Sequence, residues 1–136
     1  MVQAVAKPLT LAEFLDRPET KPASEYINGK IIQKPMPQGK HSLLQREITF
    51  ALTVACRAAK TAQAFPVLRC TFGDRSIVPD IAVIRTERIP RERDGAIADA
   101  FNIHPDWAIE ILSPNQGHAR VTRNILHCLE SGTEMA

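Results

Sequence analysis

The sequence predicts an α/β fold in which strands and helices share one domain. The first observation is a set of short runs of strand-forming residues at positions 25–32, 76–84 and 107–112. The second is the helical spacing of apolar residues over 41–59 and 119–131. The third is size, because 136 residues, 44% of them apolar, suffice for one hydrophobic core. A single domain is therefore expected over residues 1–136.

The first part of the chain predicts a short helix followed by a β-hairpin. Thr10 can cap a helix over residues 10–16, because Glu13 follows it at the capping-box distance. Residues 25–32 are expected to form a hairpin, since an Asn-Gly pair between apolar strand formers is a strong turn signal.

The remaining elements follow from periodicity and from turn residues. A loop over 34–40, rich in proline, leads into the longest helix, at 41–59. A strand is expected at 64–70, and a last helix at 119–131 that Gly132 ends. The apolar residues of the long helix predict a stripe that faces the sheet. This stripe consists of Leu44, Ile48, Ala51, Leu52, Ala55 and Ala59.

Charge and cysteine content narrow the class of protein. The net charge of +2 permits nucleic acid as a partner without arguing for it. The three cysteines are odd in number and lack the spacing of a zinc site, so a reducing, cytoplasmic location is expected. Residues 1–7 are too short to be a signal peptide, and no apolar run approaches the roughly 20 residues that cross a membrane.

Two acids stand inside apolar strand-forming runs, where an unpaired carboxylate is costly. Asp80 lies in the run 76–84 and Glu110 in the run 107–114. If the two strands are neighbours, roughly 5 Å apart, the carboxylates can converge on one point. Converging carboxylates share a proton or bind a cation. We favour the cation, and because neither strand carries His or Cys, magnesium or manganese suits the pair better than zinc.

The alternative for each acid is a simple salt bridge to a nearby arginine. Pro79 cannot donate to a β-ladder, so a bulge or a sheet edge is expected beside Asp80. His41 stands near the start of the long helix, where capping and surface roles compete with a catalytic one.

The chain resembles the Uma-type restriction endonuclease family, within the PD-(D/E)xK nuclease superfamily. The resemblance rests on Glu25 before the Asn-Gly turn, on His41, and on the stretches 78–83 and 105–114, in that order and spacing. It implies a restriction-endonuclease-like α/β core, with a mixed β-sheet that carries the catalytic acids and with flanking helices.

The resemblance also implies a metal-dependent endonuclease that acts on DNA. Asp80 and Glu110 would hold one or two magnesium ions, or manganese, with the backbone carbonyl of Ile111 as a further ligand. Glu25 and His41 would lie at the rim of the site as a supporting acid and as a phosphate or water contact.

The chain departs from the family pattern at two places. The superfamily's lysine would fall two residues after the second acid, where this chain has Leu112. Arg123 on the following helix is the first candidate to replace it, and Arg120 the next, although an arginine is a poor proton acceptor. Relatives continue beyond the position of Gly132 into a further strand, so a sheet that lacks its C-terminal strand or strands is expected.

Two other functions stay open. A truncated, catalytically inactive homologue could act as a binding module, or assemble as a homodimer that covers the bare sheet edge. A sequence-independent nucleic-acid binder is the weaker alternative, because the charge is near balance and the chain has one Trp and one Tyr for base stacking.

Overall fold

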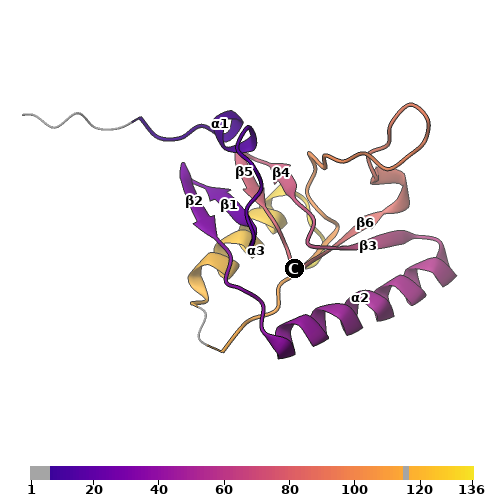
Figure 1. The fold of residues 1–136 in the computed structure, drawn as a ribbon. Helices are drawn as coiled ribbons and strands as arrows, with labels where there is room; N and C mark the ends of the chain where they lie inside the picture. Colours follow the sequence, from indigo (N-terminus) through magenta and orange to yellow (C-terminus); the bar gives the residue numbers. More distant parts are fainter. Residues whose placement is uncertain (1–6, 115–116) are drawn as a thin grey trace, which may run out of the picture.

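The computed structural model describes residues 7–114 and 117–136, and it confirms the α/β class (Figure 1). Residues 1–6, which the signal-peptide argument concerned, lie outside the described residues. The helices are α1 (Leu11–Leu15), α2 (Gly39–Ala59) and α3 (Ala119–Ser131), with a short 3-10 helix, η1 (Thr86–Arg88). The strands are β1 (Ser24–Ile27), β2 (Lys30–Gln33), β3 (Ala62–Pro66), β4 (Cys70–Phe72), β5 (Arg75–Ile77), β6 (Ile81–Arg85) and β7 (Trp107–Ile109).

The local signals at both ends of the chain are confirmed. Thr10 caps α1, because its hydroxyl oxygen accepts the backbone N–H of Glu13 at 3.1 Å. Asn28 and Gly29 turn the chain between β1 and β2 with φ angles of 52° and 79°, both in the left-handed region that a tight hairpin turn requires. The last helix ends at Gly132, whose φ is 116°.

The strands form two sheets instead of one. The larger has the order β2-β1-β5-β4 and the smaller β3-β6-β7, and neighbouring strands in both are antiparallel. The run at 76–84, expected as one strand, is divided between the sheets at Val78-Pro79-Asp80, because Pro79 has no N–H to donate there. The run at 64–70 breaks in the same way, at 67–69. The chain thus crosses between the sheets beside Asp80.

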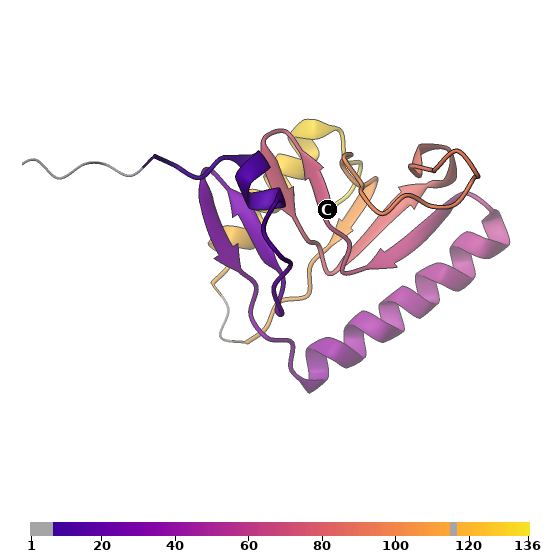
Figure 2. The same ribbon diagram turned by 45° about the horizontal axis from the view of Figure 1, so that its top comes forward.

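The predicted core-facing stripe of α2 is wrong for four of its six residues. The helix lies along β3 (Figure 2), yet none of its residues is buried. Leu44 is 49% exposed, whereas polar Gln45 and Thr49 are half-buried. Apolar residues occur around most of this helix, so their spacing did not select the face that meets the sheet. Ala51, Ala55 and Ala59 are exposed, and Ile48 and Leu52 are half-buried.

The core joins both sheets to α3, which lies behind the larger sheet (Figures 1 and 2). Residues 133–135 run beside β7, where Met135 forms a parallel bridge with Trp107. Within the described residues, no helix combines the length and apolarity needed to span a membrane. The main core cluster consists of Cys70, Ile77, Ala82, Ile84, Ile89, Phe101, Ala108 and Cys128.

Candidate active site

The register of β6 and β7 brings Asp80 and Glu110 to the same end of the smaller sheet. The strands are antiparallel, and Ile81 pairs with Ile109. Asp80 immediately precedes β6 and Glu110 immediately follows β7. Continuing the pairing by one residue sets the two acids opposite each other, and the expected convergence is found.

Lys34 lies between the two acids, although the sequence pattern did not identify it. Its Nζ donates to Asp80 Oδ1 at 2.9 Å, to Glu110 Oε2 at 3.4 Å and to the carbonyl oxygen of Val78 at 2.5 Å. Lys34 directly follows β2 and is half-buried like Ile32, two residues before it. A lysine at an inward-facing position of the hairpin was the signal that could have identified it. The partner of both acids is therefore a lysine, not the arginine of the simpler alternative.

Asp80 is held in its ionised form. Its Oδ2 accepts the backbone N–H of Ile111 at 2.7 Å and lies 3.2 Å from Nε2 of His41. Its backbone carbonyl accepts Nε2 of Gln45 at 2.8 Å. Burial alone would raise the pKa of Asp80, but the charge of Lys34, the N–H of Ile111 and the His41 ring together hold that pKa below its usual value.

Glu110 differs from Asp80 in that its pKa is raised and not lowered. Its side chain is 6% exposed. Burial, together with the charges of Asp80 and Glu25, raises the pKa of Glu110 to about 7, although Lys34 and Arg120 act in the opposite direction. Its Oε1 is buried and has no hydrogen-bond partner among the described residues. A coordinated cation would satisfy this oxygen, which is costly to leave unpaired.

The raised pKa of Glu110 predicts a pH-dependent stability of the metal-free protein. A carboxyl whose pKa rises from 4.5 to about 7 on folding binds its proton more tightly when folded. Its stabilising contribution is present below pH 4.5 and is lost as the pH rises through 7, a change of roughly 3 kcal/mol. Glu110→Gln removes this titration. We expect the free energy of unfolding in urea with EDTA to fall more between pH 5 and pH 8 for the parent than for the variant, and equal falls would contradict the assignment.

Glu25 fixes the segment that carries Asp80. It lies on β1 and is fully buried, at 0% exposure, so the expectation that it lies at the rim is wrong. Its Oε2 accepts the backbone N–H of Val78 at 2.7 Å, and its Oε1 accepts Arg120 Nη1 at 2.5 Å and Asn124 Nδ2 at 3.1 Å. Its carboxylate therefore ties the chain crossing between the sheets to α3, two residues before Asp80.

Arg120, not Arg123, reaches the site from α3. The side chain of Arg123 is exposed, and its backbone carbonyl accepts Arg75 Nη1 at 3.4 Å. Arg120 instead pairs with buried Glu25 and lines the cavity at the acid pair. Spacing on the helix explains the difference, because buried Val121, Asn124 and Cys128 mark its inner face. Arg120 lies next to Val121 and one turn before Asn124, whereas Arg123 is turned about 100° from Asn124, away from Val121.

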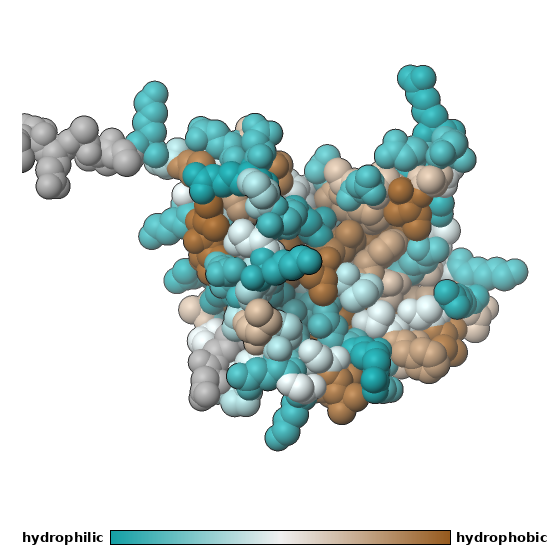
Figure 3. All heavy atoms as spheres, viewed as in Figure 1, coloured by the Kyte–Doolittle hydropathy of each residue, from teal (hydrophilic) through white to brown (hydrophobic). Residues whose placement is uncertain are grey.

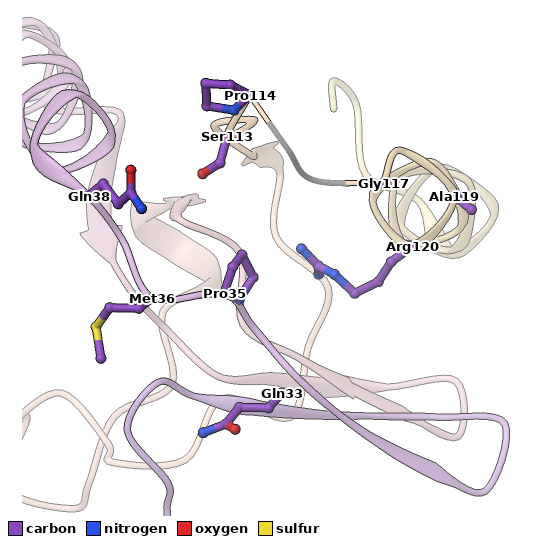
Figure 4. Close-up of a pocket in the computed structure, with 9 residues that line it drawn as sticks. All are labelled: Gln33, Pro35, Met36, Gln38, Ser113, Pro114, Gly117, Ala119 and Arg120. Atoms are coloured by element: carbon purple, nitrogen blue, oxygen red, sulfur yellow. The ribbon is translucent and has the colours of Figure 1, made fainter.

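The acid pair opens into a cavity of about 440 Å³, lined among others by Lys34, His41 and Arg120. A second cavity, of about 530 Å³, adjoins it and shares Pro35, Met36 and Arg120 with it. Figure 4 shows the Arg120 side chain extending from α3 toward Pro35. Cavities of this size accommodate small ligands or one part of a larger one. The first is called the acid cavity below.

The donor set fits a hard divalent cation bound with few protein ligands. Among the described residues, no three His, Cys, Asp or Glu side chains gather as a complete metal-ligand group. Magnesium is commonly held by one or two carboxylates and completes its shell with water and substrate phosphates. Asp80 and Glu110 supply such oxygens, and the buried, unpaired Oε1 of Glu110 suits a cation.

Comparisons with known proteins show which family and which solved structure the chain is similar to. Residues 11–135 match the family described as "Uma2: Putative restriction endonuclease". The chain is similar to a crystal structure of "a putative nuclease belonging to DUF820" from Anabaena variabilis, with 61% sequence identity and a TM-score of 0.90. The match covers 93% of this chain and 70% of that one. No curated protein matches the chain.

Proposed function

Because this chain belongs to the Uma2 family of restriction-endonuclease-like proteins, we propose that it is a metal-dependent endonuclease that hydrolyses phosphodiester bonds in DNA. The family resemblance drawn from the sequence is confirmed. The reaction, the metal and the residue roles are the proposal.

The observation that carries the proposal is Lys34 Nζ between Asp80 and Glu110. Two acids and a lysine are the side chains that the superfamily pattern requires, and the pattern's usual lysine position is occupied by Leu112. Lys34 supplies the missing lysine from the end of the hairpin. A group at this place can orient an attacking water or stabilise the charge on the phosphate.

Asp80 and Glu110 would hold a magnesium or manganese ion, with the Ile111 carbonyl as a further ligand. Such an ion lowers the pKa of bound water and stabilises charge on the phosphoryl oxygens. Asp80 is ionised and its carboxylate is fixed by the Ile111 N–H. Glu110, with a pKa of about 7, must lose its proton to bind a cation, so metal binding is expected to strengthen as the pH rises through 7.

Two further groups assist in this proposal. His41 Nε2 lies against Asp80 Oδ2 and orients that carboxylate. Arg120 lines both cavities and places a permanent positive charge where a flanking phosphate of the DNA would lie. Glu25 positions Arg120 and the Val78 segment without contacting substrate.

Nicking of supercoiled plasmid tests the proposal directly. We expect cleavage with magnesium or manganese and none with EDTA. We expect Glu110→Gln to lower the initial rate by at least about 10³-fold, because one carboxylate cannot hold the ion as two do. The exposed acid Glu92, in the loop after η1, provides the matched control, and Glu92→Gln is expected to nick plasmid at the parental rate.

Parental rates in Glu110→Gln would rule out the assigned site. No metal-dependent cleavage of supercoiled plasmid or of single-stranded DNA by folded parent protein would favour the alternative of a catalytically inactive homologue that acts as a binding or homodimeric assembly module. Circular dichroism of each sample establishes that it is folded.

A further inference from the structure

A groove continues from the acid cavity along α2. A neighbouring cavity of about 460 Å³, called the α2 cavity here, shares Gln45 and Val67 with the acid cavity. Both shared residues donate to the backbone carbonyl of Asp80, Gln45 through Nε2 at 2.8 Å and Val67 through its N–H at 3.0 Å. The α2 cavity is therefore built directly onto the residue that we place at the centre of catalysis.

Two apolar side chains of the α2 cavity are unusually exposed. Phe50 is 66% exposed and Val67 is 59% exposed, and both line it. Val67 has a φ of 50°, a region that β-branched residues rarely adopt and that clusters at functional sites. In Figure 3 apolar residues gather among polar ones at the lower right, over α2. Phe50 and Val67 together form an exposed apolar surface beside the candidate active site. Such a surface suits a ligand with a flat apolar face.

Positive charge accompanies the apolar surface. Arg46 lines the α2 cavity one helical turn from Phe50, and Lys34 and Arg120 line the acid cavity. Arg46 pairs with Glu47 at 2.8 Å, but both side chains are exposed, so the pair is weak and can yield to a phosphate. The groove thus offers cations and an aromatic ring side by side.

We propose that this groove binds an unpaired strand of nucleic acid, with one base stacked on Phe50 and the adjacent phosphate on Arg46. An unpaired strand exposes base faces and phosphates together, whereas a regular duplex hides its base faces in the stack. The inference rests on the proposed nuclease function and deepens it. It assigns the single strand, not the intact duplex, as the preferred substrate.

Fluorescence anisotropy tests the assignment without cleavage. The full chain in EDTA is titrated with labelled oligo-dT, with oligo-rU and with a fully paired DNA duplex. We expect Phe50→Ala to weaken single-strand binding by roughly 5- to 150-fold, the range for loss of one base–aromatic stack. We expect Phe50→Trp to retain it and duplex binding to be unchanged. The relative affinities for oligo-dT and oligo-rU identify which kind of strand is bound.

Leu43→Ala is the matched control, because Leu43 is 50% exposed on the same helix and lies outside both cavities. Equal effects of Phe50→Ala and Leu43→Ala would overturn the inference, as would tighter binding of the duplex. Light scattering measures the oligomeric state of the parent and of Phe50→Ala. If Phe50→Ala converts a dimer into a monomer, the exposed ring serves a second copy of the chain and the inference fails.

Cleavage separates this inference from the proposed function. Folded protein that binds single strands through Phe50 but cuts nothing would refute the nuclease and retain the groove. Metal-dependent cutting of duplex and single strand at equal rates, unchanged by Phe50→Ala, would retain the nuclease and refute the groove.

Discussion

Asp80→Asn is expected to abolish metal-dependent nicking, with a fall in rate of at least about 10³-fold. The neutral amide removes half of the charge that would hold the cation and breaks the ion pair with Lys34 Nζ at 2.9 Å. In the parent, Oδ2 of Asp80 accepts the Ile111 N–H at 2.7 Å. The amide oxygen of the asparagine can still accept this N–H. We therefore expect the fold to persist, with a loss in the free energy of unfolding of about 1 to 3 kcal/mol.

The measurements are the initial nicking rate, urea unfolding, and manganese binding followed by calorimetry. Saturable binding of one or more manganese ions by the parent and its loss in Asp80→Asn would support the assigned ligands independently of activity. Asp74→Asn is the matched control, because Asp74 is exposed in the turn between β4 and β5. A variant at position 80 that binds manganese as the parent does would contradict the proposed centre.

Lys34→Ala is expected to lower the rate of nicking by about 10² to 10⁴-fold while the chain stays folded. The variant loses the donor that contacts Asp80, Glu110 and the Val78 carbonyl. Because Lys34 lowers the pKa of Glu110, its removal also raises that pKa further. The pH at which nicking reaches half its maximum should consequently move upward. Nicking rates measured from pH 6 to pH 9 check both effects.

Lys34→Arg distinguishes two roles for the lysine. Arginine keeps the positive charge but has a pKa above about 12 and does not accept a proton. Substantial activity in Lys34→Arg would assign Lys34 to charge stabilisation, and inactivity equal to that of Lys34→Ala would assign it to proton transfer or water orientation. Exposed Lys30 in the hairpin offers the control substitution Lys30→Ala. Parental activity in Lys34→Ala would show that Lys34 has no part in catalysis and only neutralises the charge of Asp80 and Glu110 in the folded protein.

Much of the site could be predicted because strand alternation has a short range. Asp80 and Glu110 each stand out as a charge within an apolar run, and their pairing follows once the two runs are taken as neighbours. Lys34 and Arg120 could not be chosen in this way. Lys34 comes 46 residues before Asp80. Several other lysines and arginines have similar neighbours in the sequence, so nothing local selects Lys34 or Arg120.

In the fold, too, the features that depend on local interactions were predicted and those that depend on distant contacts were not. The cap of α1, the Asn-Gly turn and the end of α3 at Gly132 depend on interactions within a few residues, and the sequence predicted all three. The division into two sheets and the exposed face of α2 depend on contacts between distant segments. Apolar periodicity does not specify those contacts when more than one face of a helix is apolar.

The amino-acid sequence by itself determined the helices, the hairpin turn, the two acids and the family, because capping, turns and strand alternation are local physics. Only the tertiary structure decided which basic side chain lies between the two acids and where the groove runs. Lys34 reaches Asp80 and Glu110 because the hairpin of the larger sheet packs against the junction at Val78-Pro79-Asp80. That packing gives the buried acids Asp80 and Glu110 a distant positive partner, and it is not encoded in any single stretch.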